Sequence, residues 1–363
     1  MKITDIKTFA LDVPFRGPAP SVLHESHGDP SLPMLFARIT TDGGLTGWGE
    51  AFAYKLRDAT HAALEHVVAP RFLGRDPTDI AGPMMAVRKE FRNCTPGPLT
   101  FALSAMDMAL WDILGKMTGL PLWRLLGGGG KAALPAYASL PRFGDEAVAA
   151  HQAVKAVAAG YRHIKLHEVT YEPVASVRQA IGDSVTLMVD ASSAWNVPQA
   201  IAMAHRMRPL GLAWLEEPTW PPEDYGALTK VGREGGVPLA AGENVTSVTD
   251  LRILCEAVAA SFVQPSVGKI GGITEARKAV AIAEAYGIQV VPHAYYLGPA
   301  LLASLHLIAS MAEESLIEHA VFDVECDPYA GRMDLQNGTL PVPDAPGFGL
   351  DPDAGFLARY ARG

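Results

Sequence analysis

Three acidic positions recur at nearly equal spacing in this chain, each directly after an apolar run. Asp190 ends TLMVD, Glu216 follows LAWL, and Glu243 follows PLAAG, so that successive positions are 26 and then 27 residues apart. Carboxylates at the ends of neighbouring parallel strands converge on one point. They would repel one another there unless a divalent cation that prefers oxygen ligands lay between them. The spacing therefore predicts that Asp190, Glu216 and Glu243 form a metal site.

Two basic side chains lie in the segment GYRHIKLHEV, residues 160–169, which has the alternation of a strand. Side chains two apart on a strand share a face, so Ile164 and Leu166 would pack under helices while Lys165 and His167 face the metal. Abstraction of a proton α to a carboxylate needs a cation to stabilise the enediolate and a base near neutral pKa. We predict His167 as that base, because neutral imidazole is available at pH 7. Lys165 would supply positive charge to the substrate carboxylate.

Other strand ends carry further candidates. His293 lies in VVPHAYYLGP and Glu318 in SLIEHAV. Glu217 alternates to the face opposite Glu216, which predicts a salt-bridge partner and not a metal ligand. The glycine-rich GKIGGI at 268–273 lacks the context of a phosphate-binding loop.

The elements that must position these residues alternate from about residue 133 onward. Eight strand-like runs are separated by helix-like stretches, several of which end in glycine, and the runs are LPAYASL, HIKLHEV, TLMVDAS, LAWLEEP, PLAAGEN, SFVQPSV, IQVVPHA and SLIEHAV. Eight such periods predict an α/β fold with a parallel (β/α)8-type barrel over residues 126–330. Residues 1–125 instead predict an α+β capping domain, with alternating strands joined by a DGG turn and followed by helices. The Pro/Gly-rich tail 331–363 is expected to pack back and complete it.

The composition excludes several classes of function. The chain has 363 residues, a net charge of −9 and 49% hydrophobic residues, which favours a large core without nucleic-acid or anionic-membrane partners. No apolar run is long enough for a membrane span, and the N-terminus alternates like a strand, unlike a secretory signal. Three widely spaced cysteines, Cys94, Cys255 and Cys326, indicate reduced thiols in a cytoplasmic protein.

Together these segments resemble the mandelate racemase/muconate lactonizing enzyme branch of the enolase superfamily, a modified TIM barrel with a capping domain. The resemblance extends over essentially the whole chain and is carried by GLTGWGEA, SAMDMALWDILGKMTGLPLWRLLGG, IKLH, VDAS, WLEEP, AGEN, KIGGITEA, PHAYYLGPALLASLHL and PVPDAPGFGLD. It implies Mg²⁺ on Asp190, Glu216 and Glu243, and Glu318 as a hydrogen-bond partner of the substrate carboxylate. It further implies a small carboxylate substrate and a homo-oligomer. Substrate-discriminating residues are expected in two capping segments, at His24, His27, Tyr54, Lys55 and Arg57.

Two positions depart from the family pattern. His167 replaces the more common second lysine, which keeps a base but brings it nearer neutral pH. Ser266 stands where an aspartate, five residues before Gly-Gly, orients the seventh-strand histidine in racemases. Without that carboxylate His293 is expected to be less basic and less firmly held, which argues against a two-base racemase. Lys269 is a weaker candidate for a second base, and its position suggests a structural role.

The leading prediction is therefore dehydration of a hydroxylated (sugar) acid, with His293 protonating the departing hydroxide. Racemisation, epimerisation or cycloisomerisation of a related acid or lactone is the alternative. A metal-dependent barrel hydrolase would need an HxH pair that LPAYASL lacks, and a non-catalytic binding protein would not need Lys165 and His167.

Overall fold

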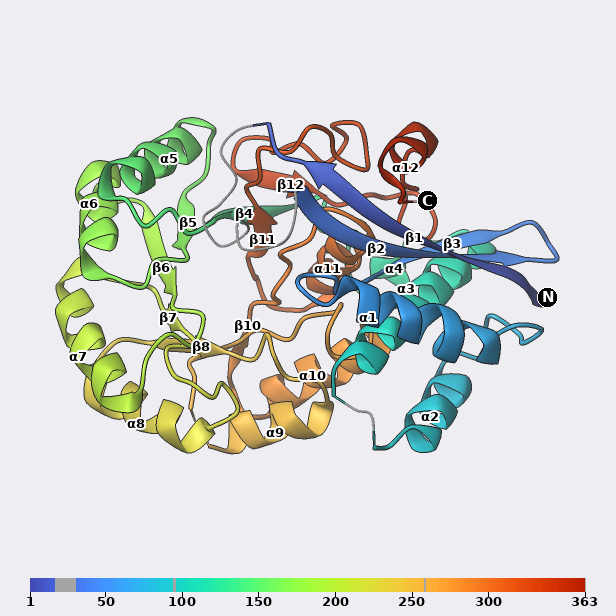
Figure 1. The fold of residues 1–363 in the computed structure, drawn as a ribbon, viewed down its shortest axis with the longest axis horizontal. Coiled ribbons are helices and arrows are strands. Elements are labelled where there is room, and N and C mark those ends of the chain that lie inside the picture. Colours follow the sequence, from blue (N-terminus) through green and yellow to red (C-terminus); the bar gives the residue numbers. More distant parts are fainter. Residues whose placement is uncertain (17–30, 94–95, 258, 363) are drawn as a thin grey trace.

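The computed structural model describes residues 1–16, 31–93, 96–257 and 259–362. Figure 1 shows an antiparallel sheet with its helices beside a parallel sheet surrounded by a ring of helices. The predicted combination of a (β/α)8-type barrel and an α+β region is confirmed. None of the described helices is long and apolar enough to pass through a lipid bilayer.

The N-terminal region is built on a three-stranded sheet in the order β1–β2–β3. The strands are β1 (Ile3–Pro14), β2 (Ser31–Thr41) and β3 (Thr46–Ala51). The DGG segment forms the turn between β2 and β3, where Gly44 has a φ of 78°, a value that glycine adopts without steric cost. The helices are α1 (Arg57–Ala62), continued by a π-helical turn (Ala63–Val68) and a 3-10 turn (Ala69–Arg71), α2 (Ala81–Glu90), α3 (Pro98–Thr118) and α4 (Leu122–Leu125).

Helix α3 lies directly against β3 because glycines of the strand leave room for the helix backbone. A Cβ added to Gly49 would stand 1.9 Å from the carbonyl oxygen of Ala105, and one added to Gly47 would stand 2.1 Å from that of Ala109. Neither distance is physically possible, so the two glycines of GWG are a packing requirement.

The barrel contains eight parallel strands in the spatial order β10–β9–β8–β7–β6–β5–β4–β11. They are β4 (Ala133–Leu140), β5 (His163–Leu166), β6 (Thr186–Asp190), β7 (Leu215–Glu216), β8 (Leu239–Ala241), β9 (Phe262–Val263), β10 (Gln289–Val290) and β11 (Ile317–Ala320). Within the described residues no ladder joins β10 to β11. Side chains connect them there, since Ser315 Oγ donates to the Val290 carbonyl at 2.7 Å and Glu318 Oε2 accepts from Ala294 N at 2.8 Å.

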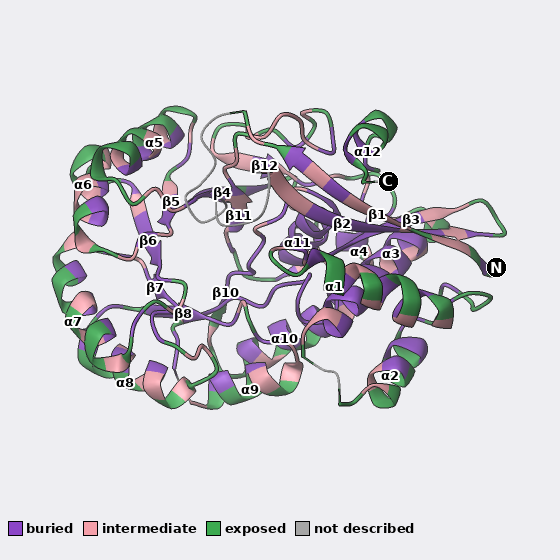
Figure 2. Cartoon of the chain, viewed as in Figure 1, coloured by how far each residue is buried: buried purple, intermediate pink, exposed green. Residues whose placement is uncertain are grey.

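A helix follows each of the first seven barrel strands. They are α5 (Glu146–Ala158), α6 (Tyr171–Ile181), α7 (Val197–Met207), extended by a 3-10 turn (Arg208–Leu210), α8 (Tyr225–Gly235), α9 (Val248–Glu256), α10 (Ile273–Ala285) and α11 (Pro299–Ser310). Figure 2 shows the strands largely buried and the outer faces of α5 to α9 exposed. Ile164 and Leu166 join the apolar layer between strands and helices, as predicted from their alternation.

A small apolar cluster underlies the polar ends of the strands. It includes Met188, Trp214 and Val291, with Tyr137 and Ala240. Met188 precedes Asp190 by two residues, and Trp214 precedes Glu216 by two. Val291 precedes His293 by the same step, so each shares a strand face with a residue of the site. The cluster therefore forms an apolar layer one pleat away from the site.

The C-terminal tail contacts both regions. Strand β12 (Thr339–Pro341) pairs antiparallel with β4 of the barrel. Helix α12 (Ala354–Tyr360) packs its apolar side chains on β1, and Arg362 N donates to the Ala10 carbonyl at 2.9 Å. The division of the chain at residues 125 and 330 stays a prediction.

Buried carboxylates hold the capping region to its neighbours. Asp112 accepts from Trp48 N at 3.0 Å and from Phe348 N at 2.8 Å, and also pairs with Lys116. Glu50 accepts from Ala300 N at 2.9 Å, at the first turn of α11. The Glu50 contact therefore joins the capping sheet to the barrel helix α11, and the Asp112 contacts join α3 to β3 and to the C-terminal tail.

Candidate active site

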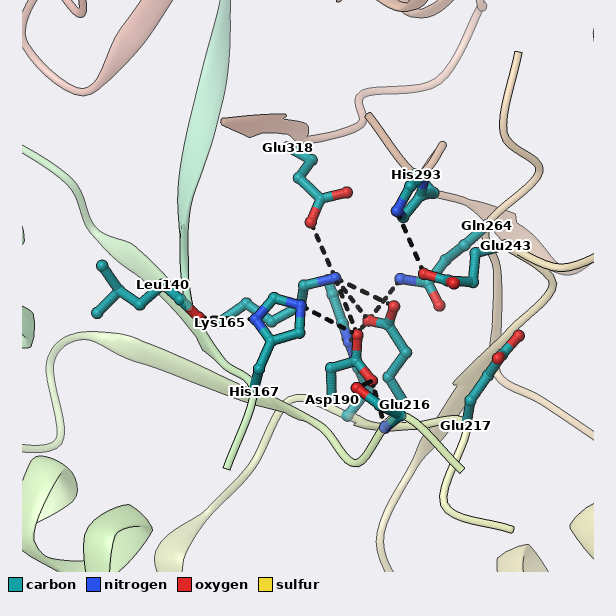
Figure 3. Close-up of polar contacts among 12 residues, drawn as sticks. Leu140, Lys165, His167, Asp190, Glu216, Glu217, Glu243, Gln264, His293 and Glu318 are labelled. Carbon is teal, nitrogen blue, oxygen red and sulfur yellow. Dashed lines mark hydrogen bonds and ion pairs between the residues drawn. The ribbon is translucent and has the colours of Figure 1, made fainter. Parts of the chain in front are cut away.

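Asp190, Glu216 and Glu243 converge at the carboxyl ends of successive strands (Figure 3). Asp190 ends β6 and pairs with Glu216 at the end of β7, while Glu243 follows β8 by two residues. One oxygen of each carboxylate lies within 4.8 Å of the others. Asp190 and Glu216 are buried, and Glu243 nearly so. Three hard oxygen donors so close together suit a divalent cation.

Lys165 lies at the centre of a buried carboxylate cluster. Its Nζ is 3.1 Å from both oxygens of Glu216, 2.9 Å from Glu318 Oε1 and 3.8 Å from Asp190 Oδ2. Burial lowers the pKa of Lys165, but the charges of Glu216 and Glu318 outweigh it and hold the pKa well above its ordinary value. Lys165 is therefore a fixed cation at neutral pH.

His167 has an acceptor on each side of its ring. Its Nδ1 lies 2.6 Å from the Leu140 carbonyl oxygen, and its Nε2 lies 3.3 Å from Asp190 Oδ2. Burial lowers the pKa of His167, but the Asp190 charge and hydrogen bond raise it overall. A carbonyl oxygen can only accept, so Nδ1 carries the hydrogen and Nε2 is the nitrogen that gains or loses a proton.

His293 occupies the opposite side of the cluster from His167 (Figure 3). Its Nε2 lies 3.2 Å from Glu243 Oε2, and its Nδ1 lies 3.2 Å from the Ser266 hydroxyl. Burial lowers the pKa of His293, against the opposing charges of Glu243 and Glu318. The two histidines therefore flank the carboxylates.

A cavity of about 460 Å³ opens beside these residues, between the capping region and the barrel. His167, Asp190, Glu243 and His293 line it. The side chains of Lys165 and Glu318 have no exposed surface, so neither reaches the cavity in this arrangement. A direct contact of either one with a substrate carboxylate stays a prediction.

The predicted capping residues have three different outcomes. Tyr54 and Lys55 line the cavity. Arg57 does not: its guanidinium turns back onto β1, where it pairs with Asp12 at 2.6 Å and contacts the Leu11 carbonyl at 3.4 Å. The expectation for Arg57 is wrong because α1 begins at this residue and directs its side chain to β1. His24 and His27 lie outside the described residues.

Glu217 is not a salt-bridge partner, contrary to expectation. Its carboxylate accepts from Gly242 N at 3.2 Å and from Asn244 Nδ2 at 2.7 Å. The residue is buried, and burial raises its pKa to about 8. Its backbone has a φ of +36°, so the chain leaves the extended geometry on which the alternation argument depended.

Lys269 lies in the cavity wall between the two regions. Its Nζ donates to Glu243 Oε1 at 2.9 Å and to Asn244 Oδ1 at 3.2 Å, and lies 4.4 Å from the centre of the Phe52 ring. The glycines that follow it pack against α3. Gly271 N donates to Ser104 Oγ at 3.0 Å, and a Cβ on Gly272 would stand 2.3 Å from Asp107 Oδ2. The amide of Gly271 is thus engaged by the capping region.

Sequence reasoning missed two buried donors to Glu216. Gln264 Nε2 lies 2.8 Å from Glu216 Oε2, and Trp214 Nε1 lies 3.0 Å from the same oxygen. Trp214 is two residues before Glu216 and so shares its strand face. Gln264 directly follows β9. The sequence did carry a signal for Gln264, because it is a polar residue at the end of an apolar strand, as Asp190 and Glu216 are.

Comparison with known proteins agrees with this arrangement. The N-terminal domain of mandelate racemase / muconate lactonizing enzyme matches residues 6–127, and the enolase C-terminal domain-like family matches residues 148–355. The chain is 31% identical to a 3,6-anhydro-alpha-L-galactonate cycloisomerase of Streptomyces coelicolor, over 96% of this chain and 98% of that one. It is also 31% identical to a D-galactonate dehydratase of Ralstonia pickettii, over 90% and 91% of the two chains.

Solved structures extend the similarity to the whole fold. A 3,6-anhydro-D-galactonate cycloisomerase from Zobellia galactanivorans superposes with a TM-score of 0.87 at 25% identity, covering 100% of both chains. A racemase from Streptomyces coelicolor with bound magnesium has a TM-score of 0.87 at 28% identity, covering 99% of this chain and 100% of that one. The chain therefore belongs to the enolase superfamily, in the branch of mandelate racemase and muconate lactonizing enzyme.

Proposed function

We propose that the protein is a Mg²⁺-dependent lyase that dehydrates a hydroxylated sugar acid after removing the proton α to its carboxylate. The observation that carries the proposal is the placement of two histidines on opposite sides of one carboxylate cluster. Relatives named D-galactonate dehydratase and arabinonate dehydratase support the substrate class. The donors Lys55 and Arg142 in the cavity wall suit a substrate with several hydroxyl groups.

His167 takes the α-proton on Nε2. The Leu140 carbonyl holds the hydrogen of the neutral ring on Nδ1, so the lone pair is on the nitrogen that faces the site. Lys165 remains charged beneath the cavity and favours negative charge developing above it. It acts through the electric field rather than as the base.

Asp190, Glu216 and Glu243 would hold the cation, and the described residues fit this role as three converging hard donors. When bound, Mg²⁺ would stabilise the negative charge that the substrate carboxylate gains as the α-proton leaves. Gln264 and Trp214 both donate to Glu216 Oε2, so they orient that carboxylate within the cluster.

His293 assists departure of the hydroxyl group from the opposite side. In its protonated form it donates the Nε2 proton, so hydroxide leaves as water. The enol that remains rearranges to a 2-keto-3-deoxy acid. The proton count is balanced, with one proton gained by His167 and one lost by His293.

Cycloisomerisation is the second candidate, because D-galactarolactone and 3,6-anhydro-alpha-L-galactonate cycloisomerases are also among the relatives. Its first step at His167 would be the same. The leaving group would then be a ring oxygen of the substrate and not a free hydroxyl.

The test is turnover of purified protein with a panel of open-chain aldonic acids, their lactones and anhydro-sugar acids. We expect a 2-keto-3-deoxy product from an open-chain acid, loss of activity with a chelator, and recovery with Mg²⁺. Turnover only of lactones or anhydro-sugars would favour the cycloisomerase. Turnover that a chelator leaves unchanged would overturn both readings.

A further inference from the structure

The Nδ1 atom of His293 faces a chain of two hydroxyl groups. Ser266 Oγ lies 3.2 Å from this nitrogen and 2.7 Å from the hydroxyl oxygen of Tyr296. Ser266 is fully buried, and Tyr296 is nearly so. The rings of His293 and Tyr296 meet edge to face, with 5.8 Å between their centres.

The chain provides room for this hydroxyl at a specific position. A Cβ on Gly268 would stand 2.4 Å from the Tyr296 hydroxyl oxygen and 2.8 Å from the ring carbon that bears it. Any other residue at 268 would therefore displace Tyr296 from Ser266. Ser266, Gly268 and Tyr296 form one packed unit behind His293.

The hydrogens of this unit have one arrangement that leaves none of them without an acceptor. Ser266 is the hydrogen-bond partner that the structure gives to the Tyr296 hydroxyl, so the phenol donates to Ser266 Oγ. The Ser266 hydroxyl then donates to the remaining neighbour, Nδ1 of His293. An Nδ1 that accepts cannot also carry a hydrogen in the neutral ring.

We propose that Ser266 and Tyr296 hold neutral His293 as the tautomer with its hydrogen on Nε2, which makes Tyr296 a positioning residue for the reaction. The catalytic consequence of this inference rests on the proposed function, in which His293 is the proton donor. In the resting enzyme, whether the ring is protonated or neutral, Nε2 then presents a hydrogen to the site. His293 therefore cannot take the α-proton in the first step, and its Nε2 becomes bare only after it has donated to a substrate oxygen.

A carboxylate at position 266 would have the opposite effect. It would accept from Nδ1–H and leave the lone pair on Nε2, which is the arrangement of a base. Ser266 thus restricts the site to proton abstraction from the side of His167. This resting tautomer disfavours two-base racemisation and epimerisation, which need a bare Nε2 on His293 before the first proton moves.

The direct test is ¹⁵N NMR of the full-length protein labelled at histidine nitrogen, with Mg²⁺ present, at neutral pH. The His293 signals are identified by their loss in His293→Asn. We expect a hydrogen-bearing Nε2 and a bare Nδ1 in the unmodified protein, a mixture of tautomers in Tyr296→Phe, and a hydrogen on Nδ1 in Ser266→Asp. Tyr329→Phe is the matched control, because this buried tyrosine has no hydroxyl partner among the described residues, and its spectrum at His293 should not change.

A hydrogen on Nδ1 and not on Nε2 in neutral His293 of the unmodified protein would overturn the proposal, as would identical spectra in Ser266→Asp. If both nitrogens carry a hydrogen at neutral pH, the ring is protonated, and the tautomer is measured after the pH is raised until the ring is neutral. The spectra need no substrate, so failure of every sugar acid to react would count against the proposed function and leave this result intact. Where a substrate is found, Ser266→Asp in a His167→Asn background should raise α-proton exchange with solvent at least about tenfold over His167→Asn alone. No increase would count against the tautomer as the restriction.

Discussion

The two histidines of the site differ in what their ring nitrogens face. Nδ1 of His167 faces a carbonyl oxygen, whereas Nδ1 of His293 faces a hydroxyl that can donate. The neutral rings therefore carry their hydrogens on opposite nitrogens. The two histidines are chemically the same residue, and their different neighbours assign one to accept a proton and the other to donate one.

His167→Asn should abolish solvent deuterium exchange at the substrate α-carbon, because Nε2 of His167 is the proposed acceptor of that proton. His293→Asn should retain exchange even where net turnover is lost, since its role comes after proton removal. Proton NMR of substrate recovered from D₂O measures this directly. Exchange that survives in His167→Asn and disappears in His293→Asn would reverse the two assignments.

Glu216→Gln should weaken Mg²⁺ binding by about tenfold or more, because it removes one charged oxygen donor from the cluster. Glu217→Gln is the matched control, since its carboxylate accepts from Gly242 and Asn244 and lies outside the three converging carboxylates; its Mg²⁺ affinity should fall by much less than that of Glu216→Gln. Isothermal titration with Mg²⁺ compares them. Equal losses in both variants would contradict the assignment of Glu216.

Much of the candidate site was predictable because strand periodicity places residues in space. The one-period spacing brought Asp190, Glu216 and Glu243 together, and the alternation in IKLH placed Lys165 beside them. Arg57 and Glu217 failed because their directions depend on a helix start and a positive φ, which alternation does not encode.

At the scale of elements, helix α11 begins against a buried carboxyl of the capping sheet. Glu50 on β3 accepts from Ala300 N, and burial raises its pKa to about 8. The free-energy cost of burying this carboxyl between the two regions is lowest when it is protonated and therefore uncharged. The contact therefore couples the stability of the interface to pH.

Stability should fall as pH rises from about 4.5 to 8, because the folded state keeps a proton on Glu50 that the unfolded chain has lost. Because the pKa of Glu50 is raised in the folded state, its contribution to stability is fully present below the pKa of the unfolded chain. The contribution is lost above the pKa of the folded protein. Its slope is at most about 1.4 kcal/mol per pH unit. Urea unfolding at several pH values should show a shallower decline for Glu50→Gln. An unchanged slope would show that Glu50 is ionised in the folded protein.

Gly49→Ala should destabilise the fold by about 3 kcal/mol or more, because its Cβ would clash with the backbone of α3. Relieving that clash would require β3 or α3 to shift. Gly129→Ala is the control, because nothing lies within 4 Å of its Cβ, and it should cost under about 0.5 kcal/mol. Thermal unfolding of both variants measures the difference. Equal melting temperatures would mean that α3 can move away from β3.

The elements themselves were largely predictable from the sequence, and their contacts across regions were not. Apolar runs and helix-ending glycines correctly indicated the eight barrel strands and the helices that follow the first seven. The sequence did not show that the glycines of GWG and GKIGG are needed for packing. Their role depends on the close approach of α3, which only the structure shows.

At the scale of the molecule, the cavity lies between a capping region and a barrel that come from separate parts of the chain. The tail touches both, through β12 on β4 and α12 on β1. The expected homo-oligomer stays a prediction, and light scattering after size-exclusion chromatography tests it.

Asp112 carries a consequence for how the protein is made. Its two oxygens accept from Trp48 and from Phe348, backbone groups separated by 300 residues along the chain. Until residue 348 has left the ribosome, a nascent chain has the Asp112 carboxylate on α3 with only part of its partners. The capping region is thus completed only after the barrel strands between Trp48 and Phe348 have been synthesised, although β1, β2 and β3 precede those strands in the chain.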